Sequence, residues 1–226
     1  ASSEDDKIAW YENNGSILTQ FNLPADNTTA ATFNVSDSGN VTDVTMTISG
    51  SEACGIIESI GKDVTRFKSG DKVMLFCRFH SYATHIIISE EMVMMLPNDF
   101  SLEEGAAFPL VYVTAYMMMF NLGNLKKGEY FFIQGAGGGV GTAAIQLGKS
   151  IGAKIIGTAS KWKHDELKKL GLDYCIDYNT ENVREKIMEY TNNYGADLII
   201  DPVGAKEWGE SYKPLAPMGK LIVYGN

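Results

Sequence analysis

Apolar residues in the C-terminal half of the chain fall into short runs that alternate with stretches of helical spacing. The short runs, typical of buried strands, cover residues 130–134, 154–159, 174–178, 197–203 and 220–224. Helical spacing covers residues 140–151, 163–170, 181–192 and 206–215. Strands that alternate with helices form right-handed βαβ units. The pattern therefore predicts an α/β fold with a doubly wound parallel sheet.

Residues 50–97 follow a different pattern, in which glycines separate short runs of β-branched residues. Gly55, Gly61 and Gly70 mark the first of these breaks, and further strands are expected at residues 82–89 and 92–96. Short strands with regular glycine breaks are typical of a small antiparallel barrel. We therefore expect a partial β-rich barrel before the parallel sheet.

A helical stretch follows Pro97. Ser101 and Glu104 have the spacing of a capping box, which predicts a helix start at residue 101. Pro109 is expected to break this helix, because proline has no backbone N–H. Residues 111–120 resume the helical pattern with apolar residues on nearly every face, including methionines at 117–119. This pattern predicts a buried connecting helix with methionines in the core.

A glycine-rich turn at residues 135–141 joins the strand at 130–134 to the helix at 140–151. Ala136, Gly138 and Gly141 keep the i, i+2, i+5 spacing of a dinucleotide fingerprint, with Ala136 in place of the first glycine. Such a turn lets backbone N–H groups approach a pyrophosphate at a helix N-terminus. The predicted phosphate cradle of this Rossmann sheet consists of Gly135, Ala136, Gly138, Gly139, Val140 and Gly141. The alternative is a purely structural strand-turn-helix.

The residues after the second strand indicate which dinucleotide is bound. An NAD-specific site places Asp or Glu about 20 residues past the glycines, where the carboxylate accepts from the ribose 2′-OH. This chain has Ser160, Lys161 and Lys163 there instead. A hydroxyl and ammonium groups suit the 2′-phosphate of NADPH. The alternative is that both lysines are solvated residues at a helix start.

The first 50 residues differ in composition from the rest. They contain seven acidic residues and one basic residue, Lys7, and four N-x-[ST] sequons at Asn14, Asn27, Asn34 and Asn40. Alternating runs at 32–36 and 41–48 predict a β-hairpin. Glycosylation of a secreted β-module is one interpretation of the sequons, and chance in an Asn- and Thr-rich stretch is the other.

Composition excludes several classes of protein. With 226 residues, 45% of them hydrophobic, the chain can build a sizeable core. The net charge of −9 argues against a nucleic-acid partner. Neither a signal peptide nor an apolar run of about 18 residues is visible, so membrane association is not indicated and a cytoplasmic location is expected.

Metal and disulfide chemistry is not indicated either. Three cysteines are scattered without C-x-x-C spacing, which predicts free thiols. The histidines at 80, 85 and 164 do not form a ligand pattern. We therefore expect no metal site, and no side chain can be assigned as a catalytic acid or nucleophile.

From about residue 50 onward the chain resembles the zinc-independent quinone oxidoreductases of the medium-chain dehydrogenase/reductase superfamily, and within them the vesicle amine transport protein group. The motifs that carry the resemblance are Gly61, Gly70-Asp71-Lys72-Val73-Met74, Thr114-Ala115-Tyr116-Met117, Gly123-Asn124-Leu125, Gly138-Gly139-Val140-Gly141, Gly157-Thr158-Ala159-Ser160, Lys163-His164-Asp165-Glu166-Leu167, Ile176-Asp177-Tyr178 and residues 217–225. Where zinc-dependent relatives have a histidine followed by Glu, this chain has Ser51.

The resemblance implies NADPH-dependent hydride transfer to a small-molecule acceptor, a quinone or an α,β-unsaturated carbonyl. It also implies a GroES-like barrel and a homodimer. Thr114 would lie near the nicotinamide, and Tyr178 near the adenosine phosphate. A second function that the resemblance permits is a non-enzymatic vesicle or membrane scaffold that keeps the nucleotide fold.

The resemblance has two gaps. Residues 1–50 show no family motif, and the family's chain continues past the position of Asn226. We therefore expect a non-matching segment at 1–50, a partial GroES-like domain at 51–100 and a Rossmann domain at 101–226 that is truncated at its C-terminus. The phosphate end of the site is expected, while the catalytic residues remain unassigned.

Overall fold

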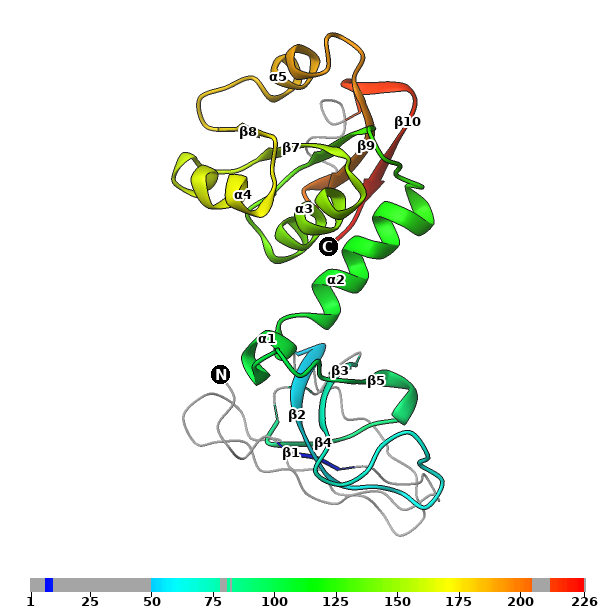
Figure 1. Cartoon of the computed structure of the whole chain (residues 1–226). Helices are drawn as coiled ribbons and strands as arrows, with labels where there is room; N and C mark the ends of the chain where they lie inside the picture. Colours follow the sequence, from blue (N-terminus) through cyan, green and yellow to red (C-terminus); the bar gives the residue numbers. More distant parts are fainter. Residues whose placement is uncertain (1–6, 10–49, 78–80, 82, 205–211, 226) are drawn as a thin grey trace, which may run out of the picture. The chain divides into compact units, whose positions relative to one another are not determined.

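The computed structural model describes residues 7–9, 50–77, 81, 83–204 and 212–225 (Figure 1). The chain divides into two compact units, Ala1–Leu110 and Val111–Asn226. Each unit contains one five-stranded sheet in the described residues.

The sheet of the second unit is parallel and has the order β10-β9-β6-β7-β8. Its strands are β6 (Tyr130–Ile133), β7 (Lys154–Thr158), β8 (Tyr174–Ile176), β9 (Ala196–Asp201) and β10 (Leu215–Val223). The chain runs from β6 outward to β8 and then returns to β9 on the other side of β6. This order confirms the predicted doubly wound sheet.

Helices cover both faces of this sheet (Figure 1). On one face, Phe131 and Ile133 pack with residues of α3 (Gly139–Ile151) and α4 (His164–Leu170). On the other face, Phe132 packs with residues of α5 (Val183–Tyr190). Phe131 and Ile133 are completely buried and Phe132 is almost so, which explains why residues 130–134 read as a continuous apolar run and not as an alternating one.

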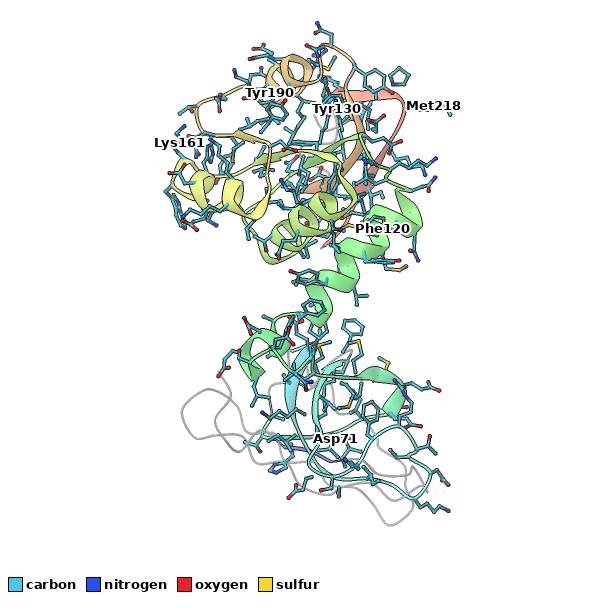
Figure 2. All side chains as sticks on the ribbon, viewed as in Figure 1. Asp71, Phe120, Tyr130, Lys161, Tyr190 and Met218 are labelled. Atoms are coloured by element: carbon cyan, nitrogen blue, oxygen red, sulfur yellow. The ribbon has the colours of Figure 1, made fainter. Side chains whose placement is uncertain are left out.

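The predicted helix at 206–215 is wrong at its C-terminal end, and its residues 206–211 lie outside the described part of the chain. Residues 212–214 form a turn, and Leu215 already pairs with Ala196 as the first residue of β10. Pro214 has no N–H with which to extend a helix. Met218 adopts a left-handed conformation (φ 65°), is 97% exposed and points away from β10 (Figure 2).

In the first unit, β2 (Glu52–Ser59), β3 (Lys72–Phe76) and β5 (Val93–Met95) pair antiparallel, as predicted. The strand expected at 82–89 is shorter, because β4 covers only His85–Ile87 before the single turn η1 (Glu90–Met92). β4 pairs parallel with β1 (Lys7–Ala9), which also pairs parallel with β2. The predicted hairpin at 32–48 and the four sequons lie outside the described residues.

The predicted capping box is confirmed at the start of α1 (Leu102–Ala106). The Ser101 hydroxyl accepts a hydrogen bond from the Glu104 N–H at 3.1 Å, and the Glu104 carboxylate accepts one from the Ser101 N–H at 2.8 Å. Pro109 then begins α2 (Pro109–Tyr116), because its missing N–H is harmless at the first helical position. The predicted break between the two helices is therefore confirmed.

The stretch predicted as a buried connector is only half buried. α2 continues into a wider π-helical segment, η2 (Met117–Leu122), in which Met118 and Met119 are buried as predicted. Val113, Tyr116 and Met117 are instead exposed by 44%, 52% and 44%. Apolar residues occur on every side of this helix, so their spacing did not distinguish the packed face from the exposed one. In the described residues, none of the helices is long and apolar enough to cross a membrane.

Candidate nucleotide site at the carboxyl ends of the strands

The glycine-rich turn lies at the carboxyl end of β6, the central strand. It is fixed to the neighbouring strand β7 by Thr158, which accepts hydrogen bonds from Gly135 N–H (to Oγ1, 2.9 Å) and Ala136 N–H (to the carbonyl oxygen, 2.9 Å). Gly135 has a φ of +71°, in the region that side chains disfavour. The two hydrogen bonds to Thr158 thus join the turn to β7.

The start of α3 is open toward the carboxyl ends of the strands. Gly138 precedes the helix with an extended backbone and supplies no side-chain cap. The first N–H groups of α3 therefore lack the side-chain partner that most helix starts have, and they carry the positive end of the helix dipole. Such an N-terminus is suited to a phosphate.

Gly141 shows why the turn needs its last glycine. A Cβ atom there would lie 2.6 Å from the Gly135 carbonyl oxygen and 2.7 Å from the Ala136 backbone. Both neighbours belong to the main chain and cannot move aside. Gly139 lies close to α2, since a Cβ atom at this position would be 3.0 Å from the side-chain atom Val111 Cγ1. Val140, by contrast, packs on the core beneath α3.

Two of the predicted cofactor-binding residues meet. Ser160, after β7, and Tyr178, after β8, share a hydrogen bond of 2.9 Å between their hydroxyl oxygens. Tyr178 is 54% exposed, so this pair faces solvent at the ends of both strands. Two hydroxyl groups side by side can donate to one anion.

Lys163, the predicted positive charge of the site, contacts the glycine turn. It ends the single turn η3 (Lys161–Lys163), and its ammonium donates to the Gly137 carbonyl oxygen at 3.3 Å. Its nitrogen also lies 5.0 Å from the centre of the Trp162 ring. Lys163 therefore lies against the glycine turn in this structure, whereas Lys161 stands at the outer end of the unit (Figure 2).

Two glycines of the site, Gly137 and Gly157, were not predicted from the sequence. A Cβ at Gly137 would lie 2.7 Å from Lys163 Cδ, so this glycine makes room for the lysine stem. A Cβ at Gly157 would lie 2.6 Å from the methyl group of Ala136. An isolated glycine inside a strand is a known sign of close backbone approach, and it was the available signal for Gly157. Gly137 has no such signal, because it falls outside the fingerprint spacing.

Thr114, the residue predicted near the nicotinamide, lies on α2 and is half buried. Among the described residues no hydrogen bond joins it to the glycine turn. Its helix nevertheless approaches the turn through Val111, as the contact at Gly139 shows. The structure therefore brings the helix that carries Thr114 to the turn.

An open pocket of about 620 Å³ adjoins the glycine turn on the α5 side of the sheet. Gly135, Thr158 and Tyr178 line it, so it continues from the turn to the hydroxyl pair. Apolar side chains form most of its remaining wall, and three polar side chains complete it: Phe132, Val183, Ile187, Val203 and Pro214, with Gln134, Asn182 and Arg184. The volume and the few polar groups are typical of a small-molecule site.

The remaining reactive groups do not form a catalytic cluster in the described part of the chain. Burial raises the pKa of the Cys54 and Cys175 thiols to about 11, so both stay protonated at neutral pH. Burial likewise raises the pKa of Glu52, whose carboxylate accepts from the Leu110 N–H at 2.8 Å. The ring of His164 is buried, with Nε2 2.9 Å from the Ala159 carbonyl oxygen. These groups support the fold.

Metal-ligating side chains do not gather either. In the ranges that the structure describes, no three His, Cys, Asp or Glu residues come close enough to hold a metal ion. His85 pairs with Glu58 at 3.5 Å and has no further such neighbour. His80 lies outside the described residues.

Comparison with known proteins gives matches over most of the chain. Residues 27–118 match the model described as alcohol dehydrogenase GroES-like domain, and residues 139–226 match the model described as zinc-binding dehydrogenase. The first match begins inside the segment 1–50, so residues 27–50 match a family model although their composition differs from the rest.

Individual relatives agree with these models. The synaptic vesicle membrane protein VAT-1 homolog of Danio rerio is 38% identical over 177 residues, which are 78% of this chain and 36% of that protein. A quinone oxidoreductase of Pseudomonas aeruginosa is 34% identical, over 78% of this chain and 55% of that protein. The Escherichia coli quinone oxidoreductase, solved as a complex with NADPH, is 32% identical with a TM-score of 0.74, over 79% of this chain and 55% of that one. The chain thus spans between about a third and a half of the length of these relatives.

Proposed function

Because the chain belongs to the medium-chain dehydrogenase/reductase family, we propose that it binds NADPH and acts as an oxidoreductase, or as part of one, that reduces a quinone or an α,β-unsaturated carbonyl compound. The observation that carries the proposal is the uncapped N-terminus of α3 behind a turn that tolerates no side chain at Gly141. When bound, NADPH supplies the hydride, and the chain's own residues bind and orient it.

The residues at the carboxyl ends of the strands fit the phosphates of NADPH. Backbone N–H groups from Gly138 to Gly141 would hold the pyrophosphate at the start of α3. The hydroxyl pair of Ser160 and Tyr178 would hold the 2′-phosphate, with Lys163 supplying a positive charge close by. No acidic residue stands where an NAD-specific site would need one, since that position is Ser160.

The positions of the other predicted residues support this arrangement. Gly135 and Ala136 fix the turn to Thr158, and Val140 anchors α3 on the core. Thr114 would approach the nicotinamide from α2, whose Val111 already contacts the turn. We assign no proton donor to this chain. The division at residues 50 and 100 belongs to the same proposal, with residues 27–50 included in the GroES-like match.

A fluorescence titration tests the proposed cofactor. NADPH is expected to bind with an enhanced, blue-shifted nicotinamide emission, and NADH to bind about 10- to 100-fold more weakly, because the charged hydrogen bonds to the 2′-phosphate are missing. Lys163→Glu should weaken NADPH binding by about 10-fold or more, since it places a carboxylate near the phosphates. Lys126→Glu is the matched control, because Lys126 is exposed on the loop before β6. Absence of any response to either nucleotide would refute the proposal.

A non-enzymatic scaffold is the second candidate, favoured by the 38% identity to a synaptic vesicle membrane protein VAT-1 homolog. The two candidates differ in turnover. An oxidoreductase oxidises NADPH in the presence of at least one member of a quinone and enone panel, followed by the loss of nicotinamide absorbance. NADPH binding without oxidation across the whole panel favours the scaffold.

A cytoplasmic location and a homodimer complete the proposal. The location is supported by the use of NADPH inside cells, and the dimer by the family resemblance alone. Light scattering over a range of protein concentrations tests the dimer, and a mass equal to one chain at every concentration would contradict it.

A further inference from the structure

The apolar pocket beside the glycine turn has the chemistry of a site for a flat aromatic ring. Phe132 forms part of its wall from the sheet, and Ile187 and Val183 form part from α5. The hydroxyl pair of Ser160 and Tyr178 meets the pocket at Tyr178. A nucleotide whose 2′-phosphate lies at this pair therefore has its base within reach of the apolar wall.

Among the described residues that line this pocket, Arg184 is the only charged one. It belongs to the first turn of α5, and its side chain is exposed. No hydrogen bond, ion pair or ring contact engages its guanidinium within the described residues. The nearby acidic residues have other partners: Glu181 accepts from the Asp177 N–H, and the Glu185 carboxylate faces Asn182. The guanidinium is thus available to a ligand in the pocket.

We propose that Arg184 determines affinity for the adenine base by stacking its guanidinium on the face of that base, with the other face toward the apolar wall. A guanidinium is planar, weakly hydrated and prefers aromatic faces. The inference rests on the proposed function and deepens it, because it separates recognition of the base from recognition of the 2′-phosphate.

The arrangement favours the base over the 2′-phosphate as the partner of Arg184. Of the three side chains proposed for the 2′-phosphate, Lys163 and Ser160 do not line the pocket, and Tyr178 does. Arg184 does, together with Phe132 and Ile187. An aromatic ring can contact a guanidinium on one face and apolar side chains on the other. A dianionic phosphate in the same cavity would lose hydration against the apolar side chains, which is costly.

The test compares NADPH and NADH on the full chain. Arg184→Ala is expected to raise the dissociation constants of both dinucleotides by the same factor, about 3- to 30-fold, because both carry the same base. Arg184→Lys keeps the charge without the planar group and should recover only part of the loss. Arg66→Ala, which removes an arginine from the other unit, is the matched control and should change neither constant.

Three other results would overturn the inference. A loss confined to NADPH assigns Arg184 to the 2′-phosphate and overturns the inference, as does unchanged affinity for both dinucleotides. A loss for both that coincides with a lower unfolding midpoint of Arg184→Ala without ligand also overturns it, since the effect is then structural. If the unmodified chain binds neither dinucleotide, the proposed function itself fails, which is distinguishable because the variant is not needed to see it.

Discussion

The glycines of the turn differ in the space available for a side chain, and this difference should be visible in the stability of alanine variants. At Gly141 a methyl group would meet main-chain atoms at 2.6 and 2.7 Å. At Gly138 it would lie 3.5 Å from the Gly135 carbonyl oxygen, an ordinary contact. The two positions belong to the same fingerprint, yet we expect only the first to be required for folding.

Gly141→Ala should therefore lower the free energy of unfolding by about 1 to 3 kcal/mol, the usual cost of overpacking. Chemical denaturation measures this change. Gly138→Ala is the control, with a change of less than about 0.5 kcal/mol expected for a substitution free of such a clash. Equal stability of the two variants would show that the turn can widen and that Gly141 is not sterically constrained.

Gly137→Ala is expected to displace the Lys163 side chain without disturbing the main chain. Its methyl group would meet Lys163 Cδ, the flexible part of a side chain that can swing away. We expect a smaller loss of stability than for Gly141→Ala, together with a weaker affinity for NADPH of about 3- to 10-fold, because the ammonium leaves the turn. Nucleotide titration checks this result, and NADPH affinity equal to that of the unmodified chain would contradict it.

At the scale of elements, the loop between β8 and α5 is organised by one carboxylate. Asp177 accepts hydrogen bonds from the Asn179 N–H and side-chain amide, both at 3.1 Å, and from the Thr180 hydroxyl at 3.3 Å. These bonds, led by the one from the Asn179 N–H, lower the pKa of Asp177 below its ordinary value of 3.8. They also end β8 at Ile176, two residues before the predicted end.

A lowered carboxylate pKa stabilises the fold above the ordinary pKa, and the stabilisation disappears as the pH falls through the lowered value. Asp177→Asn should therefore be less stable than the unmodified chain at pH 7, and the difference should shrink below pH 3.8. Denaturation curves of both proteins at several pH values measure this. A difference that stays constant down to the lowest pH would mean that the charge of Asp177 contributes nothing.

Elements with a distinctive local signal were predictable from the sequence. The capping box of Ser101 and Glu104 and the glycine fingerprint both depend on residues a few positions apart, and both were found. The start of β10 at Leu215 was not predicted. Its partner Ala196 is distant in sequence, and the pairing of the two strands overrides the helical spacing of the apolar residues. The contact of Lys163 with Gly137 was not predicted, since it depends on the space beside Gly137, which only the folded turn creates.

At the scale of the whole molecule, a ligand that binds only the folded chain raises its stability. NADPH at 100 times its dissociation constant should add about 2.7 kcal/mol to the free energy of unfolding. For a chain of this size that corresponds to a rise of about 5 to 10 °C in the unfolding midpoint. Thermal unfolding followed by circular dichroism checks the rise, and NADH at the same concentration should give a smaller one. No shift with saturating NADPH would contradict the proposed cofactor.

The contact between Ala136 and Gly157 has a consequence for how this fold can change over evolution. The space between β6 and β7 holds one methyl group, which Ala136 supplies and Gly157 leaves out. A change of Ala136 to glycine would remove the 2.6 Å contact that excludes alanine at 157 and would leave the 3.1 Å contact with Leu172 Cδ1, a side-chain atom. The effects of substitutions at the two positions are therefore expected to depend on each other. The order in which substitutions arrive, and not only their identity, decides which versions of this nucleotide turn are reachable.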